Sequence, residues 1–192
     1  MTKTLEFLPG AGDGLLVVDI QNDFIKGGSL AVTGGEEVVP VLNDWIRRFE
    51  DAGLPVIYTR DWHPPDHCSF AEQGGPWPPH CVQGTRGAEF VDELEMRDDA
   101  IVMSKAMDPG REEYSDFADG TFEEILREIG VSRLVVGGLA TDYCIKATVL
   151  DALAAGFPTC VLAAGVRAVD VEPGDGDRAL AEMEAAGATI IG

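Results

Sequence analysis

Basic residues are scarce in this chain of 192 residues: lysine and arginine number 14, aspartate and glutamate number 34, and the formal net charge is −20. Only four of the basic residues are lysines. Nucleic acids and anionic membrane surfaces would be repelled by such a charge, so we expect neither as a partner. A surface rich in carboxylates and poor in lysine indicates a halophilic source with a salty cytoplasm. An acidic protein from a GC-rich genome is the alternative.

Long apolar runs and a disulfide framework are lacking as well. No apolar stretch reaches the roughly 20 residues that a membrane-spanning helix needs. Met1–Gly10 has neither the basic start nor the apolar centre of a secretory signal peptide. Four cysteines in a chain of this length do not form the disulfide framework of a small exported domain. We therefore expect a cytoplasmic protein whose thiols are reduced.

Short apolar runs alternate with amphipathic segments along the chain. The runs typical of strands cover residues 14–19, 55–59, 100–104, 133–136, 159–163 and 189–191. Helical spacing of apolar residues covers 36–52, 121–129, 141–155 and 172–186. This alternation predicts a single three-layer α/β/α domain over residues 1–192, with a mainly parallel sheet of about six strands covered by helices on both faces.

Residues 60–99 interrupt this alternation with five prolines and few helix signals. A loop of this length inside a compact domain is functional or disordered, and its three histidines and two tryptophans argue against disorder. Asp61, His63, His67 and His80 form a set of side chains suited to a divalent metal ion such as Zn²⁺, and these ligand types do not separate zinc from iron or manganese. A site using the two cysteines of the loop, or simply solvated histidines, are the alternatives.

Reactive side chains follow the predicted strands at their carboxyl ends, where parallel sheets bind ligands. Asp19 ends the first strand, Lys105 follows the third, and Cys144 follows the fourth in the first turn of a helix that Thr141 can cap. We expect Cys144 to be a nucleophile, with helix N–H groups that favour a thiolate and hold an oxyanion. Asp19 is the candidate proton acceptor and Lys105 its partner. Taken singly, a buried core cysteine, a turn-capping aspartate and a surface lysine are the plainer interpretations.

Several segments together resemble one known family. They are VVDIQNDF at 17–24, DWH at 61–63, WPPHCVQGT at 77–85 and GLATDYC at 138–144, joined by the lysine after the third strand. In order and spacing the chain resembles nicotinamidases, also called pyrazinamidases, of the isochorismatase-like cysteine hydrolase superfamily. The resemblance covers essentially the whole chain, and DWH with WPPH distinguishes nicotinamidases from isochorismatases, which lack the metal site.

The resemblance implies a catalytic triad of Asp19, Lys105 and Cys144. The oxyanion hole of the family maps to the backbone N–H groups of Ala140 and Cys144, with a cis peptide bond expected between Leu139 and Ala140. The implied reaction is hydrolysis of nicotinamide to nicotinate and ammonia through a cysteine thioester, as in NAD salvage, with pyrazinamide as a further substrate. A related cysteine amidohydrolase acting on another small amide or ureido compound is the alternative.

A metal site is implied as well. One divalent ion, zinc in the first place with iron or manganese open, would be bound by Asp61, His63 and His80 and would meet the pyridine nitrogen of the substrate. His67 matches a further histidine ligand that only some members of the family have. From a different class of protein, the same loop would be a structural zinc site in a small-molecule binding protein with an unreactive Cys144.

The substrate pocket follows from the same resemblance. Phe24 and Trp77 match the pair of side chains that flanks the pyridine ring, and Tyr114 would line the pocket. Ala106 departs from the glycine that often follows the lysine in the family, which weakens the basis for placing Tyr114. Whether the chain forms a homo-oligomer stays open at this point.

The composition leads to a prediction about salt. Screening weakens the repulsion among surface carboxylates, so the melting temperature should rise between about 0.1 M and about 1 M potassium chloride, as the Debye length falls from about 10 to about 3 Å. Thermal unfolding followed by circular dichroism measures this effect. Equal melting temperatures at the two concentrations would contradict it.

Overall fold

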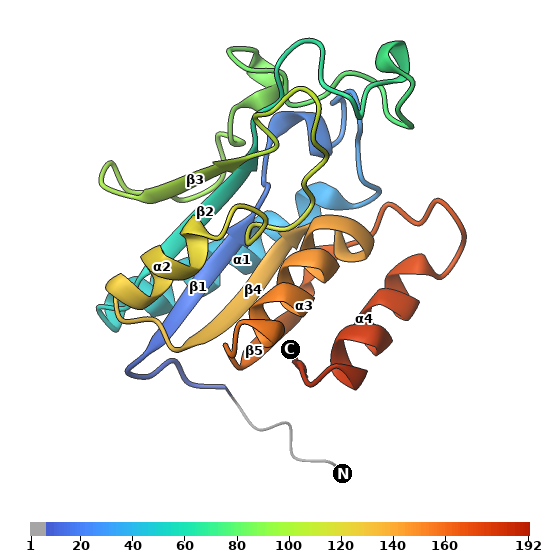
Figure 1. The fold of residues 1–192 in the computed structure, drawn as a ribbon. Helices are drawn as coiled ribbons and strands as arrows, with labels where there is room; N and C mark the ends of the chain where they lie inside the picture. Colours follow the sequence, from blue (N-terminus) through green and yellow to red (C-terminus); the bar gives the residue numbers. More distant parts are fainter. Residues whose placement is uncertain (1–6) are drawn as a thin grey trace.

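A single sheet forms the centre of the protein, whose computed structural model describes residues 7–192. Its strands are β1 (Asp13–Val18), β2 (Val56–Asp61), β3 (Ile101–Lys105), β4 (Arg133–Leu139), β5 (Thr159–Arg167) and β6 (Thr189–Ile191). They lie in the order β3-β2-β1-β4-β5-β6, and every neighbouring pair is parallel (Figure 1). This confirms the predicted α/β fold. The expectation about Met1–Gly10 falls mostly outside the described residues.

Both faces of the sheet are buried, as the continuous apolar sequence of β1 predicts. Side chains alternate between the faces of a strand, so Leu15 and Val17 enter one core and Leu16 and Val18 the other. All six residues of β1 are buried. The central strand is therefore covered on both sides.

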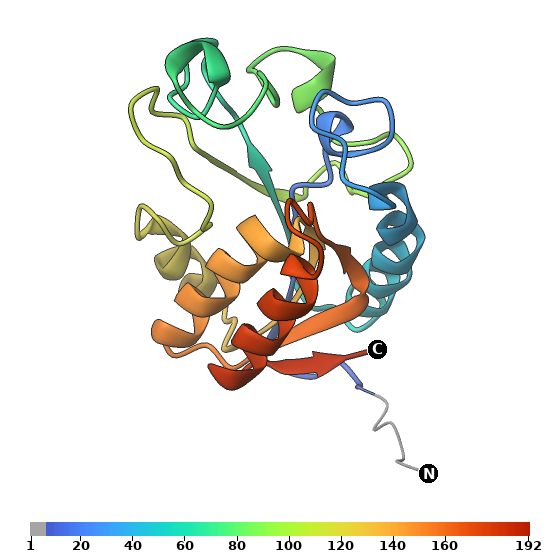
Figure 2. The same cartoon turned by 90° about the vertical axis from the view of Figure 1, so that its right-hand side faces the viewer.

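Helices form the two outer layers (Figure 1 and Figure 2). They are α1 (Val38–Asp51), α2 (Thr121–Glu128), α3 (Lys146–Ala154) and α4 (Asp175–Ala185). Leu42 and Phe49 of α1 pack in the core that holds Leu15, whereas Phe122 of α2 and Met183 of α4 pack in the opposite core. Helix α1 thus covers one face alone, and α2, α3 and α4 share the other. No helix within residues 7–192 combines the length and the apolar character needed to cross a membrane.

The elements differ from their predicted bounds mainly where tertiary pairing extends them. Strand β4 continues through two glycines to Leu139, because it pairs there with both β1 and β5. Strand β2 likewise continues to Asp61, which pairs with Lys105 at the end of β3. The single helix predicted over 141–155 is divided into a π-helical turn and α3.

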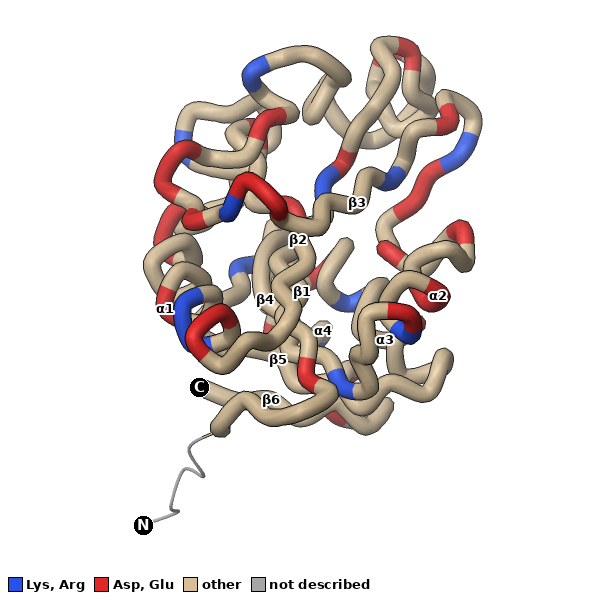
Figure 3. The backbone as a smooth tube through the Cα atoms, turned by 90° about the vertical axis from the view of Figure 1, so that its left-hand side faces the viewer, with Lys and Arg blue, Asp and Glu red and all other residues tan. Residues whose placement is uncertain are grey.

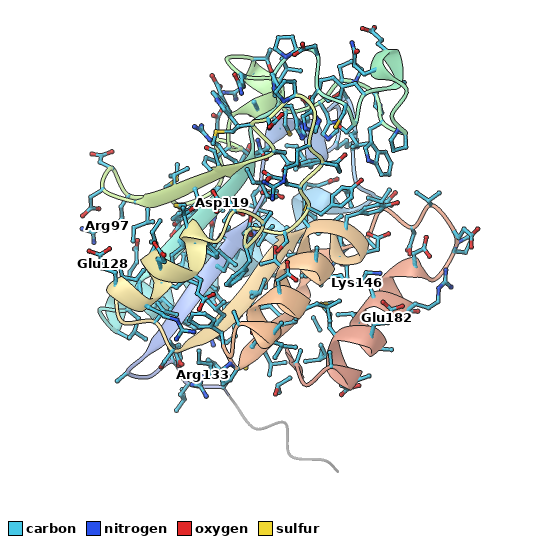
Figure 4. The ribbon with its side chains drawn as sticks, in the orientation of Figure 1. Arg97, Asp119, Glu128, Arg133, Lys146 and Glu182 are labelled. Carbon is cyan, nitrogen blue, oxygen red and sulfur yellow. The ribbon has the colours of Figure 1, made fainter. Side chains whose placement is uncertain are left out.

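Acidic residues are spread over the helices and loops around the sheet, with fewer basic residues among them (Figure 3). Some of the basic residues are paired: Arg133 lies 2.6 Å from Asp13, and Lys146 of α3 lies 3.2 Å from Glu182 of α4 (Figure 4). Asp13 itself is buried, whereas both members of the Lys146–Glu182 pair are partly exposed, and a pair of the latter kind contributes about 1 kcal/mol or less. The surface therefore carries the charge that the composition predicts.

Gly138 brings the carboxyl ends of β1 and β4 together. It pairs with Val18 and has a φ of +135°, a conformation that other residues rarely adopt. A Cβ at this position would collide with the backbone oxygen of Val18. Glycine therefore permits the close approach that places the segment after β4 beside the end of β1.

Replacement of Gly138 by alanine tests this point. Gly138→Ala should lower the free energy of unfolding by about 3 kcal/mol or more, because backbone strain and a collision with β1 add together. Gly130→Ala is the matched control, since Gly130 also has a positive φ of +83° but an added Cβ there meets nothing within 4 Å. It should cost only about 1 kcal/mol. Equal losses in urea unfolding would contradict the argument.

Candidate active site

A buried lysine lies at the centre of the charged cluster at the carboxyl edge of the sheet. Lys105, the last residue of β3, is only 7% exposed. Its Nζ lies 2.5 Å from Asp19, 3.3 Å from Asp61 and 3.2 Å from Asp116. Burial alone would lower the pKa of Lys105, but these carboxylates raise it well above its usual value. The residue is therefore a buried ammonium and not a surface lysine.

Asp19 follows β1 directly and has a left-handed φ of +53°. Its side chain is fully buried and accepts hydrogen bonds from Lys105 Nζ and, at 3.2 Å, from Thr59 Oγ1. Burial raises the pKa of Asp19 to about 7, although the Lys105 ammonium opposes this shift. A carboxylate with such a pKa can accept and return a proton near neutral pH.

Cys144 lies in the π-helical turn Thr141–Ile145 and is 5% exposed. The expected cap does not form: the residue before the turn is Ala140, and no side chain caps it. The peptide bond between Leu139 and Ala140 is cis, as the resemblance implied. Burial raises the pKa of the Cys144 thiol well above its usual value, although Lys105 lowers it. Burial therefore favours the protonated thiol, and its attack on a substrate needs a base.

Carboxylates lie close enough to Cys144 to serve as this base. One carboxylate oxygen each of Asp19 and Asp61 and the Sγ of Cys144 all lie within 4.8 Å of one another. Lys105 contacts both carboxylates. The structure thus brings together the three residues expected to form the triad, together with one of the expected metal ligands.

Asp61 also forms a second group with His63 and His80, called the metal-ligand group below, whose ligand atoms lie within 4.8 Å of one another. His63 Nδ1 lies 3.0 Å from the carbonyl oxygen of His80, and His80 Nδ1 lies 2.8 Å from that of Pro78. A carbonyl oxygen only accepts, so both Nδ1 atoms carry a proton, and Nε2 is the ring atom left on each histidine to bind a metal ion. Burial lowers the pKa of His63 to about 4, which keeps its ring neutral.

The carboxylate of this group fits the same purpose. Burial alone would raise the pKa of Asp61, but the Lys105 ammonium holds it below its usual value. Within the described residues, Asp61 Oδ1 is buried without a hydrogen-bond partner, although the Lys105 ammonium lies 3.3 Å away. Two imidazoles and one carboxylate are a donor set that zinc and related divalent ions accept.

His67 lies beside this group, with its ring centroid 4.3 Å from that of His63. Its Nδ1 lies 2.8 Å from Ser69 Oγ and its Nε2 lies 3.0 Å from the carbonyl oxygen of Arg111. Both ring nitrogens therefore have protein partners. His67 and His63 also form a second cluster of ligand atoms with Glu112, a residue that the sequence did not single out.

Side chains after β1 hold the histidine loop in place. Gln21 accepts the Asp61 N–H at 2.9 Å and donates to the Asp61 carbonyl at 2.7 Å. Asp23 Oδ2 accepts the N–H of Cys81 at 2.7 Å, next to His80. The position of the metal-ligand group thus depends on the QND segment of the first motif.

A small, largely apolar cavity opens beside Cys144. It is lined by the three predicted pocket residues Phe24, Trp77 and Tyr114, together with Leu30, Val32, Asp61, His80, Ala140, Tyr143, Cys144 and Val169. Trp77 Nε1 donates to the Tyr114 hydroxyl at 3.1 Å. Tyr143 packs against both rings, with centroids at 5.1 and 5.4 Å.

Sequence reasoning had missed some of these lining residues. Tyr143 belongs to the GLATDYC motif and could have been found there. Leu30, Val32 and Val169 carry no signal beyond being apolar.

Known proteins are similar to this chain in fold and in sequence. A family model described as isochorismatase domain matches residues 13–192. The nicotinamidase of Escherichia coli (strain K12) is 41% identical over 197 residues, which cover 92% of each chain. Among solved structures, the pyrazinamidase of Pyrococcus horikoshii in complex with zinc has a TM-score of 0.89 at 46% identity, covering 94% of this chain and 98% of that one. PnC1 from L. infantum in complex with nicotinate has a TM-score of 0.88 at 34% identity, covering 96% and 94%.

Removal of the central ammonium leads to a prediction about stability. Lys105→Met should lower the free energy of unfolding by about 3 kcal/mol near neutral pH, because it leaves buried carboxylates without a cation. Without the ammonium, the buried carboxylates have higher pKa values in the folded than in the unfolded protein, so folding takes up protons. The loss of stability caused by Lys105→Met should therefore become smaller as the pH falls toward about 5. Urea unfolding at a series of pH values measures both effects.

Lys26→Met is the control, because Lys26 is exposed and its loss changes the net charge equally. It should change stability by less than about 0.5 kcal/mol. A loss for Lys105→Met that equals the control, or that does not depend on pH, would contradict the description of the cluster.

Proposed function

The chain belongs to the isochorismatase domain family, and from this membership and the site geometry we propose that it hydrolyses nicotinamide to nicotinate and ammonia, and pyrazinamide by the same route. One observation carries the proposal: a single cavity is lined by Cys144, by two members of the metal-ligand group, Asp61 and His80, and by aromatic side chains. A flat neutral ring fits between aromatic side chains. A carboxamide on that ring would lie within reach of the thiol.

Asp61, His63 and His80 are the residues that would hold one divalent ion, with zinc as the best match to two imidazoles and a carboxylate. When bound, the ion supplies a Lewis-acid site that accepts the lone pair of an aromatic ring nitrogen. In this proposal the loop at about residues 60–99 is the metal-binding loop of a single domain. Its two free cysteines are not required as ligands.

The chemical steps fall to this chain's own residues. Asp19 takes the proton of the Cys144 thiol, and Sγ attacks the carbonyl carbon of the carboxamide to form a C–S bond. The backbone N–H groups of Ala140 and Cys144 are proposed to hold the oxyanion, at about 3 kcal/mol for each donor. When the tetrahedral intermediate collapses, the C–N bond breaks and the proton on Asp19 passes to the departing ammonia. A thioester of nicotinate remains on Cys144.

Hydrolysis of the thioester reverses these roles. Asp19, ionised again, takes a proton from an attacking water molecule, the C–S bond breaks, and the proton returns to Sγ as nicotinate leaves. The Lys105 ammonium stabilises the negative charge that moves between Asp19 and Cys144 during both halves. We further propose that the enzyme acts in the cytoplasm, where the thiol stays reduced, and that neither nucleic acid nor membrane is a partner.

Loss of the nucleophile is the most specific test of this mechanism. Cys144→Ala should lower nicotinamide turnover by about 10⁴-fold or more without unfolding the protein, because the acyl group then has no acceptor. Ammonia release measures turnover. Cys160→Ala is the control, since Cys160 is also a buried free thiol but lies in β5 away from the cavity residues. Retained activity in Cys144→Ala would refute the assignment.

A substrate panel distinguishes nicotinamide hydrolysis from a related amidase reaction. Nicotinamide and pyrazinamide should give higher kcat/KM values than linear amides and ureido compounds, because the cavity walls are aromatic. A preference for ureido compounds would sustain the Cys144 chemistry and overturn the substrate.

Metal removal tests the role of the histidine loop. Chelation should lower turnover at low nicotinamide concentration at least about tenfold, and added zinc should restore it. The fold should persist, because the apolar cores on both faces of the sheet do not involve the metal-ligand group. Unchanged activity in protein verified to be metal-free would refute the role in catalysis, and unfolding upon chelation would indicate a structural site.

A further inference from the structure

Asp116 is the third carboxylate on the Lys105 ammonium, and the proposed chemistry does not use it. It lies between β3 and α2, is 8% exposed, and places Oδ1 3.2 Å from Lys105 Nζ. Thr148 of α3 fixes its position: the Thr148 hydroxyl lies 3.3 Å from Asp116 Oδ2 and also accepts the Asp116 N–H at 3.1 Å. This carboxylate is therefore anchored to a helix and aimed at the ammonium.

Asp116 contacts the ammonium beside a second cavity. Lys105 and Asp116 line this second cavity, together with Asp108 and other residues of the segment between β3 and α2. In the described part of the chain, neither of the two lines the cavity that contains Cys144 and the aromatic walls. Lys105 and Asp116 thus border the second cavity, whereas Asp61, another partner of the ammonium, borders the cavity that contains Cys144.

Charge counting shows what the extra carboxylate provides. Three buried carboxylates surround one ammonium. In the proposed reaction Asp61 serves the metal-ligand group, and Asp19 becomes neutral each time it takes the thiol proton. A neutral Asp19 attracts the ammonium far less than an ionised one. Asp116 is the remaining carboxylate that can hold the ammonium at that moment.

We propose that Asp116 is a positioning residue, whose carboxylate keeps the Lys105 ammonium in place while Asp19 carries the proton of Cys144. This inference rests on the hydrolysis proposed above and adds to it a residue that contacts neither the substrate cavity nor the reacting atoms. Without Asp116, none of the carboxylates that line the second cavity in the described part of the chain lies within 4.0 Å of the ammonium. It can then move toward water during the steps that need its charge beside Cys144.

The first experiment separates kcat from KM. Asp116→Asn keeps the shape of the side chain and an oxygen for the Thr148 hydroxyl, but removes the charge. It should lower kcat roughly tenfold or more, as displaced catalytic groups do, and leave KM for nicotinamide within about twofold. Asp108→Asn is the matched control: Asp108 lines the same cavity, and its Oδ1 accepts the Gly110 N–H at 2.8 Å. It should leave both constants unchanged.

The second experiment observes the ammonium itself. The chain has only four lysines, so protein labelled with ¹⁵N-lysine gives few side-chain signals. The Lys105 signal, identified by its absence from Lys105→Arg, should be visible near neutral pH in the unaltered protein and in Asp108→Asn. It should be lost by exchange with water in Asp116→Asn.

These two readouts decide the proposal together. A lower kcat with an unchanged KM and a lost Lys105 signal supports it. An unchanged signal, or a loss shared between kcat and KM, overturns it. Circular dichroism and zinc content verify that Asp116→Asn is folded and loaded. If it is not, Thr148→Val decides, because it loosens the same carboxylate without removing charge and should give a smaller loss of the same kind. Absence of turnover in the unaltered protein would refute the proposed function alone, since the ammonium signal still tests Asp116.

Discussion

The contact between one buried ammonium and three carboxylates is the interaction on which the rest of the site depends. Strands β3, β2 and β1 are neighbours, and their carboxyl ends carry Lys105, Asp61 and Asp19 in that order. A charge this deeply buried is tolerated only when it is paired. The strand order and register therefore place the ammonium beside the carboxylates, so that each charge is paired, and they place the proposed proton acceptor in the same cluster. The pKa of Asp19 near 7 follows from this balance, because burial favours the neutral acid and Lys105 the carboxylate.

Asp61 connects the two halves of the site. It contacts Lys105 in the charged cluster and lies with His63 and His80 in the metal-ligand group. The side chain of Gln21, two residues after Asp19, accepts a hydrogen bond from the Asp61 N–H and donates one to the Asp61 carbonyl oxygen. A displacement of the histidine loop would therefore also displace Asp19 and Lys105, because only one or two contacts separate them from the loop. This coupling explains why a loop whose regular structure is limited to two short 3₁₀ turns can hold reactive groups: contacts with the end of a central strand fix its position.

Much of this arrangement could be predicted from the sequence. Continuous apolar runs and helical spacing predicted the strands and helices, and the rule for carboxyl ends predicted that Asp19, Lys105 and Cys144 meet. Contacts that depend on irregular backbone could not be predicted in this way. Asp116 lies in a segment with no periodicity, and its contact with Lys105 depends on an anchor in α3. The π-helical turn at Cys144 and the extension of β4 through its glycines likewise follow from tertiary pairing, which overrides local propensity.

The account depends most directly on an acyl group carried by Cys144, because the proposed role of the charged cluster is to move a proton to and from that thiol. Enzyme mixed with nicotinamide, quenched in acid during the first turnover and digested, can be analysed by mass spectrometry of the peptide that contains Cys144. We predict a nicotinoyl group on this cysteine that appears before steady-state nicotinate and disappears once nicotinamide is consumed. Turnover at the normal rate with Cys144 unmodified at every quench time, or with the nicotinoyl group on another residue, would contradict the account.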